Sequence, residues 1–352
     1  MAEADIAEAE ILTDPRDRSW HDICELGLQT YANDLDTKGY CVIPPEIANP
    51  NPSDLPQRMA EALLNIAERR NGERPNVETG ETHANRPPLK HGFDGAKFSG
   101  KKSGKETPAP AVLDQEAVDS PFGDGMALIF SEDEVFAEAV MNPVLQAMVT
   151  HLVGYSAVLS SMGCWMKGPC RTNFQLHSDN ALPNPLPETA YQAQCTYVLT
   201  DFDRENGATC IVPGSHKWLR RPTGNEGDLA LYEEGGKDQA VVIDAPAGSL
   251  IVWHGNTWHG AFNRKAPGLR LSVTVYFVRD FIRPLEDYID NVPQEWLDKY
   301  GPRFAMRLQQ GSVPGAKTQA KRVADSERAD KFKAAYEKSI GVGIGERTNP
   351  HH

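Results

Sequence analysis

The sequence lacks the features that mark secreted and membrane-spanning proteins. None of its apolar runs approaches the roughly 20 residues that a helix needs to cross a bilayer. The acidic start of the chain has neither the basic nor the apolar region of a signal peptide. The six cysteines contain no C-x-x-C pair, so we expect reduced, buried thiols rather than disulfides or a zinc site. These absences predict a cytoplasmic protein.

Positive charge is also scarce. The 352 residues include 36 Lys and Arg against 49 Asp and Glu, which gives a formal net charge of −13. Nucleic acids and anionic membranes select basic surfaces, so neither is expected as a partner. A hydrophobic content of 40% is ordinary for a globular chain, and the length is sufficient for a full core.

Composition and pattern divide the chain into three predicted regions. Residues 1–34 form an N-terminal arm, residues 35–285 the main domain, and residues 286–352 a C-terminal helix with a polar tail. Within the main domain, residues 72–125 are rich in Gly, Pro, Lys and Asn and show no sustained period. Such an insertion is typical of a lid, a binding loop or a disordered segment. The tail from Gly311 is polar and mixed in charge, which suits a surface arm or a disordered segment.

Secondary-structure patterns favour a mainly β fold with flanking helices. Helical patterns cover 53–70, 131–154 (one helix, or two interrupted near Pro143) and 285–310. A period of two marks strands over 39–46, 156–167, 172–177, 193–200, 208–213, 241–244, 249–253, 258–262 and 270–278. Turn residues separate most of these short strands, so we expect a double-sheet jelly roll or a barrel rather than a βαβ array.

Two potential metal ligands stand where one predicted strand ends. His177 and Asp179 are separated by one residue in FQLHSDNALP, so on an extended chain their side chains project to the same side. An isolated H-x-D also arises by chance, and a solvated strand end is the alternative until a third ligand is found. His254 and His259 follow about 80 residues later. Two histidines and one carboxylate on a β scaffold form the facial triad of non-haem Fe(II) oxygenases, which leaves coordination positions open.

These residues belong to a series of motifs that resembles the phytanoyl-CoA dioxygenase family of Fe(II)/2-oxoglutarate-dependent oxygenases. The series runs HSD, then YVLTDFDRENGATCIVPGSHKW, then APAGSLIVWHGNTWHGAFN, and Arg270 lies eleven residues after His259. The resemblance spans roughly residues 35 to 280. It implies a double-stranded β-helix (a cupin-like jelly roll) that uses Fe(II), 2-oxoglutarate and O₂, with ascorbate as the reductant in vitro. It also implies that His177, Asp179 and His259 bind the iron and that Arg270 binds the distal carboxylate of 2-oxoglutarate.

The spacing within this series also decides between the two later histidines. The eleven-residue offset to Arg270 assigns His259 as the ligand, and His254 is expected either to support the ligands from behind or to be a satisfied polar residue near the mouth of the site. Ser272 lies two residues past Arg270 on the same strand face, so either its hydroxyl shares the carboxylate of the co-substrate or it is a core-facing serine. Phe174 either packs on the co-substrate or is a plain core aromatic.

The predicted function is oxidation of an unactivated C–H bond in a small-molecule metabolite, with release of succinate and CO₂. Hydroxylation is the default outcome, and desaturation or ring formation stay open because the position of the substrate carbon decides among them. Two other classes also stay open. One is a non-catalytic metal-binding jelly-roll sensor. The other is a zinc hydrolase, although the H-E-x-x-H motif of many such hydrolases is absent from the sequence.

Overall fold

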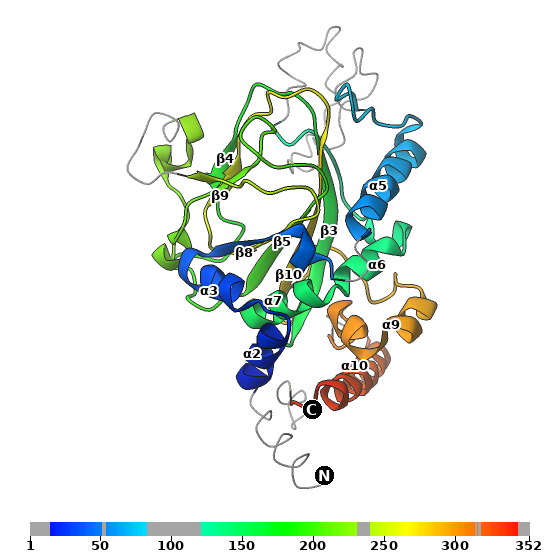
Figure 1. The fold of residues 1–352 in the computed structure, drawn as a ribbon. Coiled ribbons are helices and arrows are strands. Elements are labelled where there is room, and N and C mark those ends of the chain that lie inside the picture. The colour runs from blue at the N-terminus through cyan, green and yellow to red at the C-terminus, as the bar shows by residue number, and fades with distance from the viewer. Residues whose placement is uncertain are drawn as a thin grey trace.

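Two antiparallel sheets form the centre of the molecule, and helices cover one side of them (Figure 1). The structure is a computed structural model, and it describes residues 15–50, 54–82, 121–230, 240–313, 315 and 318–343. Most of the basic insertion, residues 83–120, therefore lies outside the described residues, and the prediction of a lid or binding loop is not addressed there. Within the described ranges, no helix combines the length and apolar character that a membrane span requires.

The larger sheet contains six strands in the described residues, in the order β1-β8-β5-β10-β3-β2. All neighbouring strands pair antiparallel. The strands are β1 (Tyr40–Ile43), β2 (Asp124–Met126), β3 (Ala157–Lys167), β5 (Gln192–Val198), β8 (Leu250–His254) and β10 (Arg270–Arg279). The sequence pattern predicts each of them except β2, which is only three residues long and lies at the end of the insertion.

The smaller sheet has the order β4-β9-β6-β7. Its strands are β4 (Phe174–His177), β6 (Thr209–Ile211), β7 (Val241–Val242) and β9 (His259–Ala261). An apolar cluster joins the two sheets face to face, because Ile251 and Trp253 of the larger sheet pack with Ile211 of the smaller one. Two facing antiparallel sheets of this kind are a jelly roll, so the predicted fold class is confirmed.

Alternation along β10 shows how the larger sheet separates two environments. Leu271, Val273 and Phe277 belong to the main hydrophobic core beneath the helices, whereas Arg270 and Ser272 point to the opposite, inner side. The covering helices are α5 (Leu55–Asn71), α6 (Val135–Val140), α7 (Pro143–Val153) and α9 (Gln294–Arg307). Polar residues on the inner side of the sheet therefore face the smaller sheet.

The break between α6 and α7 occurs at Pro143, one of the two predicted arrangements. Asn142 precedes this proline and caps α7, because its side-chain oxygen accepts hydrogen bonds from the backbone N–H groups of Val144 and Leu145 at 2.9 and 3.3 Å. Three further helices lie in the N-terminal part of the described chain, between residues 15 and 50. They are α2 (Pro15–Glu25), α3 (Gln29–Lys38) and α4 (Pro45–Ala48). Helices α2 and α3 lie in or extend into the region predicted as an N-terminal arm.

The tail beyond Gly311, expected to be a surface arm or a disordered segment, instead contains the 22-residue helix α10 (Gln319–Ile340). This helix packs beside α9 (Figure 1). Tyr336 of the helix belongs to a small apolar cluster that includes Met306. Five of its nine apolar residues are alanines spread around the helix, so its sequence carries no clear hydrophobic stripe. The helix is held against α9 by the tertiary packing of a few side chains, and sequence periodicity does not reveal such packing.

The cysteines are free, as expected, but two of them are not buried. Cys24 is exposed and Cys170 is partly exposed, because each lies outside the strands of the sheets. The remaining four lie in the sheets and are buried: Cys41, Cys164, Cys195 and Cys210. Burial raises the pKa of Cys164 and of Cys210 to about 12, which keeps these thiols protonated and unreactive.

Candidate metal centre

Two histidines and one aspartate meet on the smaller sheet. His177 ends β4 and His259 begins β9, and the antiparallel register makes them direct partners with ring centroids 4.2 Å apart. Asp179 follows β4 after one residue. Its Oδ1 lies 3.6 Å from His177 Nε2 and its Oδ2 lies 3.5 Å from His259 Nε2. One potential ligand atom from each residue therefore lies within 4.8 Å of the other two.

Backbone carbonyls orient both imidazole rings. His177 Nδ1 lies 3.0 Å from the carbonyl oxygen of Gln175, and His259 Nδ1 lies 3.1 Å from that of Thr257. Because a carbonyl only accepts hydrogen bonds, each Nδ1 carries the proton and donates it. Each Nε2 then keeps its lone pair directed toward Asp179, which is the tautomer that a metal-binding histidine requires.

The electrostatics of the cluster suit a divalent cation. Burial lowers the pKa of His259 to about 4, so this imidazole is neutral at neutral pH. Burial would raise the pKa of Asp179, but the neighbouring imidazoles outweigh it and lower the pKa overall, so the carboxylate is ionised. Its Oδ2 is buried without a hydrogen-bond partner. A metal ion would satisfy this oxygen and both Nε2 atoms, and two imidazoles with one carboxylate are a ligand set for Fe(II).

Arg270 presents a buried positive charge on the inner face of the larger sheet. Its guanidinium lies 4.4 Å over the ring of Phe202, and its Nη1 donates to the carbonyl oxygen of Gly207. Its Nε is buried without a partner. Burial, followed by the charge of Arg264, lowers the pKa of Arg270 to about 9. Because no carboxylate of the described residues forms an ion pair with it, Arg270 is well suited to bind the carboxylate of a ligand.

The two weaker candidates also lie in this region. Ser272 is buried and shares the inner face of β10 with Arg270. Phe174 is partly exposed, and its ring centroid lies 4.4 Å from that of His177. On its other side it contacts Phe122 at 4.1 Å. The structure thus places Phe174 against a candidate ligand, and its predicted contact with a co-substrate stays a prediction, as does that of Ser272.

Lys167 is a member of the site that the sequence did not reveal. It is fully buried at the end of β3, and its Cα is the register partner of that of Arg270. Its Nζ donates to the carbonyl oxygens of Phe262 and Gly207. Burial, followed by the charge of Arg270, lowers the pKa of Lys167 to about 7. A lysine at a strand end is usually solvated, so there was little reason in the sequence to place Lys167 in the site. Its two-residue spacing from Trp165 puts both side chains on one face of β3, but this spacing identifies a site residue only once the inner face of the sheet is known.

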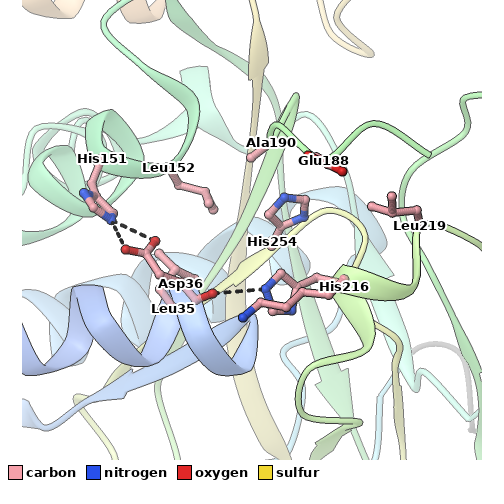
Figure 2. Close-up of a pocket in the computed structure, with 10 residues that line it drawn as sticks. Leu35, Asp36, His151, Leu152, Glu188, Ala190, His216, Leu219 and His254 are labelled. Atoms are coloured by element: carbon pink, nitrogen blue, oxygen red, sulfur yellow. Dashed lines mark hydrogen bonds and ion pairs between the residues drawn. The ribbon is translucent and has the colours of Figure 1, made fainter. Parts of the chain in front are cut away.

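His254 lies in a different place from the one expected. It follows Trp253, whose ring packs 4.9 Å from His259, and so it points to the other side of β8. There it lines a cavity of about 440 Å³ together with His216 and Asp36 (Figure 2). Its Nδ1 accepts a hydrogen bond of 3.0 Å from the backbone N–H of Asn256. His254 is therefore a satisfied polar residue of a separate cavity rather than a residue at the mouth of the metal cluster.

Comparison with known proteins places this arrangement in a family. Residues 35–272 match the family model described as phytanoyl-CoA dioxygenase (PhyH), which covers more than half of the chain. The chain belongs to the phytanoyl-CoA dioxygenase family. The family assignment agrees with the resemblance inferred from the HSD motif, the PGSHK motif and the offset between His259 and Arg270, and its bounds are close to those predicted.

Individual relatives of this phytanoyl-CoA dioxygenase family member are distant. Dioxygenase af480 of Aspergillus fumigatus is 25% identical over 174 residues, which are 49% of this chain and 54% of the relative. The uncharacterized protein Rv1501 of Mycobacterium tuberculosis is 32% identical over 113 residues, or 32% of this chain and 37% of the relative. The chain thus matches about half of these relatives' length or less. The crystal structure of HygX from Streptomyces hygroscopicus with nickel and 2-oxoglutarate has a TM-score of 0.49 at 16% identity, covering 73% of this chain and 88% of HygX.

Proposed function

We propose that this chain is an Fe(II)- and 2-oxoglutarate-dependent dioxygenase that hydroxylates a C–H bond of a small-molecule metabolite, with release of succinate and CO₂. The observation that carries the proposal is a pairing of two features on the facing inner surfaces of the jelly roll. One is the cluster of two histidines and one aspartate with an unpartnered carboxylate oxygen. The other is the buried guanidinium of Arg270, which has no acidic partner among the described residues.

Each side chain of the site has a defined task in this proposal. His177, Asp179 and His259 would bind the iron through Nε2, a carboxylate oxygen and Nε2, and three positions would stay open. Arg270 would hold the distal carboxylate of 2-oxoglutarate, and so orient the keto acid toward the metal. When bound, iron and 2-oxoglutarate together supply the oxidising power that removes a hydrogen atom from the substrate and inserts oxygen. The two sheets contribute positioning and exclusion of water.

The inner wall beside the cluster supports a neutral substrate with ring or alkyl surfaces. Phe122 stacks on Trp165 with centroids 5.1 Å apart, and Trp165 is partly exposed on the inner face of β3. Tyr276 and Gln194 are register partners on that same face, are also partly exposed, and carry no charge. Among the inner-facing residues of β3, β5 and β10, the charged ones are Lys167 and Arg270. Lys167 is the last residue of β3 and Arg270 is the first residue of β10, so both lie at one edge of this wall. An uncharged molecule therefore fits this wall better than an ionic one.

Anaerobic spectroscopy followed by a turnover screen tests the proposal. We expect Fe(II) with 2-oxoglutarate to produce a weak visible charge-transfer band, and O₂ with a suitable metabolite to produce succinate in proportion to product. A protein that binds zinc for hydrolysis would give no band. A binding or sensor protein would give the band without substrate-dependent succinate across a broad library of neutral metabolites. Either of these two results would contradict the proposed oxygenase function.

A further inference from the structure

We propose that Lys167 binds the distal carboxylate of the co-substrate together with Arg270, so that two cations rather than one define this end of the site. The inference rests on the proposed function and adds a residue that neither the sequence motifs nor the family assignment indicates. It identifies Lys167 as a positioning residue for 2-oxoglutarate, outside the group of candidate metal ligands. Its basis is the geometry of two neighbouring strands and the absence of a counter-ion.

The register of the larger sheet places the two cations side by side. Lys167 and Arg270 are opposite each other on adjacent antiparallel strands, which lie about 4.8 Å apart in a sheet. Both donate to one acceptor, the carbonyl oxygen of Gly207, at 3.4 Å for Lys167 Nζ. Gly207 has a φ of 66°, and a Cβ at this position would lie 2.7 Å from the backbone nitrogen of Arg264. Glycine thus permits the tight turn that brings this carbonyl to both cations.

Neither cation has an acidic partner in the described part of the chain. The contacts of Lys167 are the carbonyl oxygens of Gly207 and Phe262, and those of Arg270 are Gly207 and the ring of Phe202. Two like charges buried without a counter-ion disfavour each other's charged form, and carbonyl dipoles offset only part of that cost. A carboxylate that arrives with the ligand would supply the missing negative charge and would also reach the unpartnered Nε of Arg270.

The charge of Lys167 should therefore be linked to co-substrate binding. Burial, then Arg270, lowers its pKa to about 7, and the other titratable groups that face it are Cys170, Cys210 and Arg264. A bound carboxylate favours the ammonium form, so the pKa of Lys167 is higher in the complex than in the free protein. Binding then takes up a proton near neutral pH. As pH rises above about 7, the dissociation constant for 2-oxoglutarate should increase by up to about tenfold per pH unit.

A pair of keto acids separates this role from a purely structural one. 2-Oxopentanoate has the same chain length as 2-oxoglutarate but ends in a methyl group, so it can use the metal but not the cations. We would titrate both into the anaerobic Fe(II) protein, follow the charge-transfer band, and compare the wild type with Lys167→Met. We expect the dissociation constant for 2-oxoglutarate to rise about 10- to 100-fold. The constant for 2-oxopentanoate should stay within about twofold.

Two further variants complete the design. Lys265→Met removes a lysine that is 52% exposed and pairs with Glu205 at 3.9 Å, and it should change neither constant. Lys167→Arg keeps the charge but does not titrate near pH 7, so it should bind 2-oxoglutarate with an affinity that is flat between pH 6.5 and 8.5. This variant also serves if Lys167→Met does not fold.

The possible outcomes distinguish this inference from the proposed function. An equal loss of affinity for both keto acids in Lys167→Met would mean that the lysine only supports the fold, and would overturn the inference. A pH dependence that persists unchanged in Lys167→Arg would overturn it as well. If the wild-type protein bound neither keto acid, the proposed function itself would fail. Wild-type binding that Lys167→Met leaves unchanged would leave the function standing and refute the role of Lys167 alone.

Discussion

A matched pair of histidines provides the sharpest test of the metal centre. His254 ends β8 and His259, five residues later, begins β9, and the two residues are 5% and 7% exposed. Only His259 has its Nε2 beside Asp179, at 3.5 Å, whereas His254 points into the separate cavity of Figure 2. We predict that His259→Ala abolishes metal binding and turnover, and that His254→Ala retains both.

The structure allows the cost of each substitution to be compared. His254 accepts a hydrogen bond from the backbone N–H of Asn256, and His259 donates one to the carbonyl of Thr257. Each truncation thus leaves one buried backbone group unpaired, which costs about 1–3 kcal/mol in unfolding free energy. The two metal-free variants should therefore lose similar stability. Metal at 100 times its dissociation constant adds about 2.7 kcal/mol to a protein that binds it. That increment corresponds to a rise in Tm of roughly 4 °C for a chain of this size.

The assay measures Tm anaerobically with and without Fe(II) or Co(II), and measures metal content after desalting. We expect the wild type and His254→Ala to show the rise in Tm and to retain one metal per chain, and His259→Ala to show neither. The metal-free Tm values control for general loss of stability. If His254→Ala lost the metal while His259→Ala kept it, the assignment of ligands, and with it the role of the register between β4 and β9, would be wrong.

Three further predictions address the co-substrate, the acid limb of stability and the product. Arg270→Ala removes one partner of a buried charge contact, which typically costs about 2–5 kcal/mol. The dissociation constant for 2-oxoglutarate should therefore rise from about 30-fold to several thousand-fold with iron still bound, and an unchanged titration would refute this role. Burial, followed by the charge of His216, lowers the pKa of His254 from 6.5 to about 4 in the folded protein. As the pH falls below 6.5, this imidazole is therefore protonated in the unfolded chain before it is protonated in the folded protein, which lowers the free energy of unfolding. Urea unfolding should show that His254→Ala loses up to about 3 kcal/mol less stability between pH 6.5 and 4 than the wild type, whereas equal losses would contradict a neutral buried imidazole. If Asp179 binds the metal as proposed, it would fill the position that a halide would need, so the product made under ¹⁸O₂ in chloride buffer should contain one labelled oxygen by mass spectrometry and no chlorine.

Local sequence pattern predicted much of the fold, and the elements that it missed were missed for physical reasons. The strands from β3 to β10 have a period of two and are bounded by turn residues, so they were predictable within a few residues. Helix α10 was not, because its charged surface is held by a few contacts such as that of Tyr336 with the α9 cluster. Strand β2 was also missed, since three residues are too few to show a period.

By itself, the sequence indicated the family and the candidate ligands, through a resemblance carried by H-x-D and by the offset between His259 and Arg270, both of which are local spacings along the chain. Only the tertiary structure decided which side of each strand faces the cluster. Two histidines five residues apart look alike in the sequence, yet the fold packs the ring of Trp253 against His259, and the alternation along β8 then directs His254 into another cavity. The register between β3 and β10 sets Lys167 opposite Arg270, 103 residues away along the chain, and so creates a pair of buried cations. Strand pairing is a long-range property, and the contacts it makes are absent from any local segment.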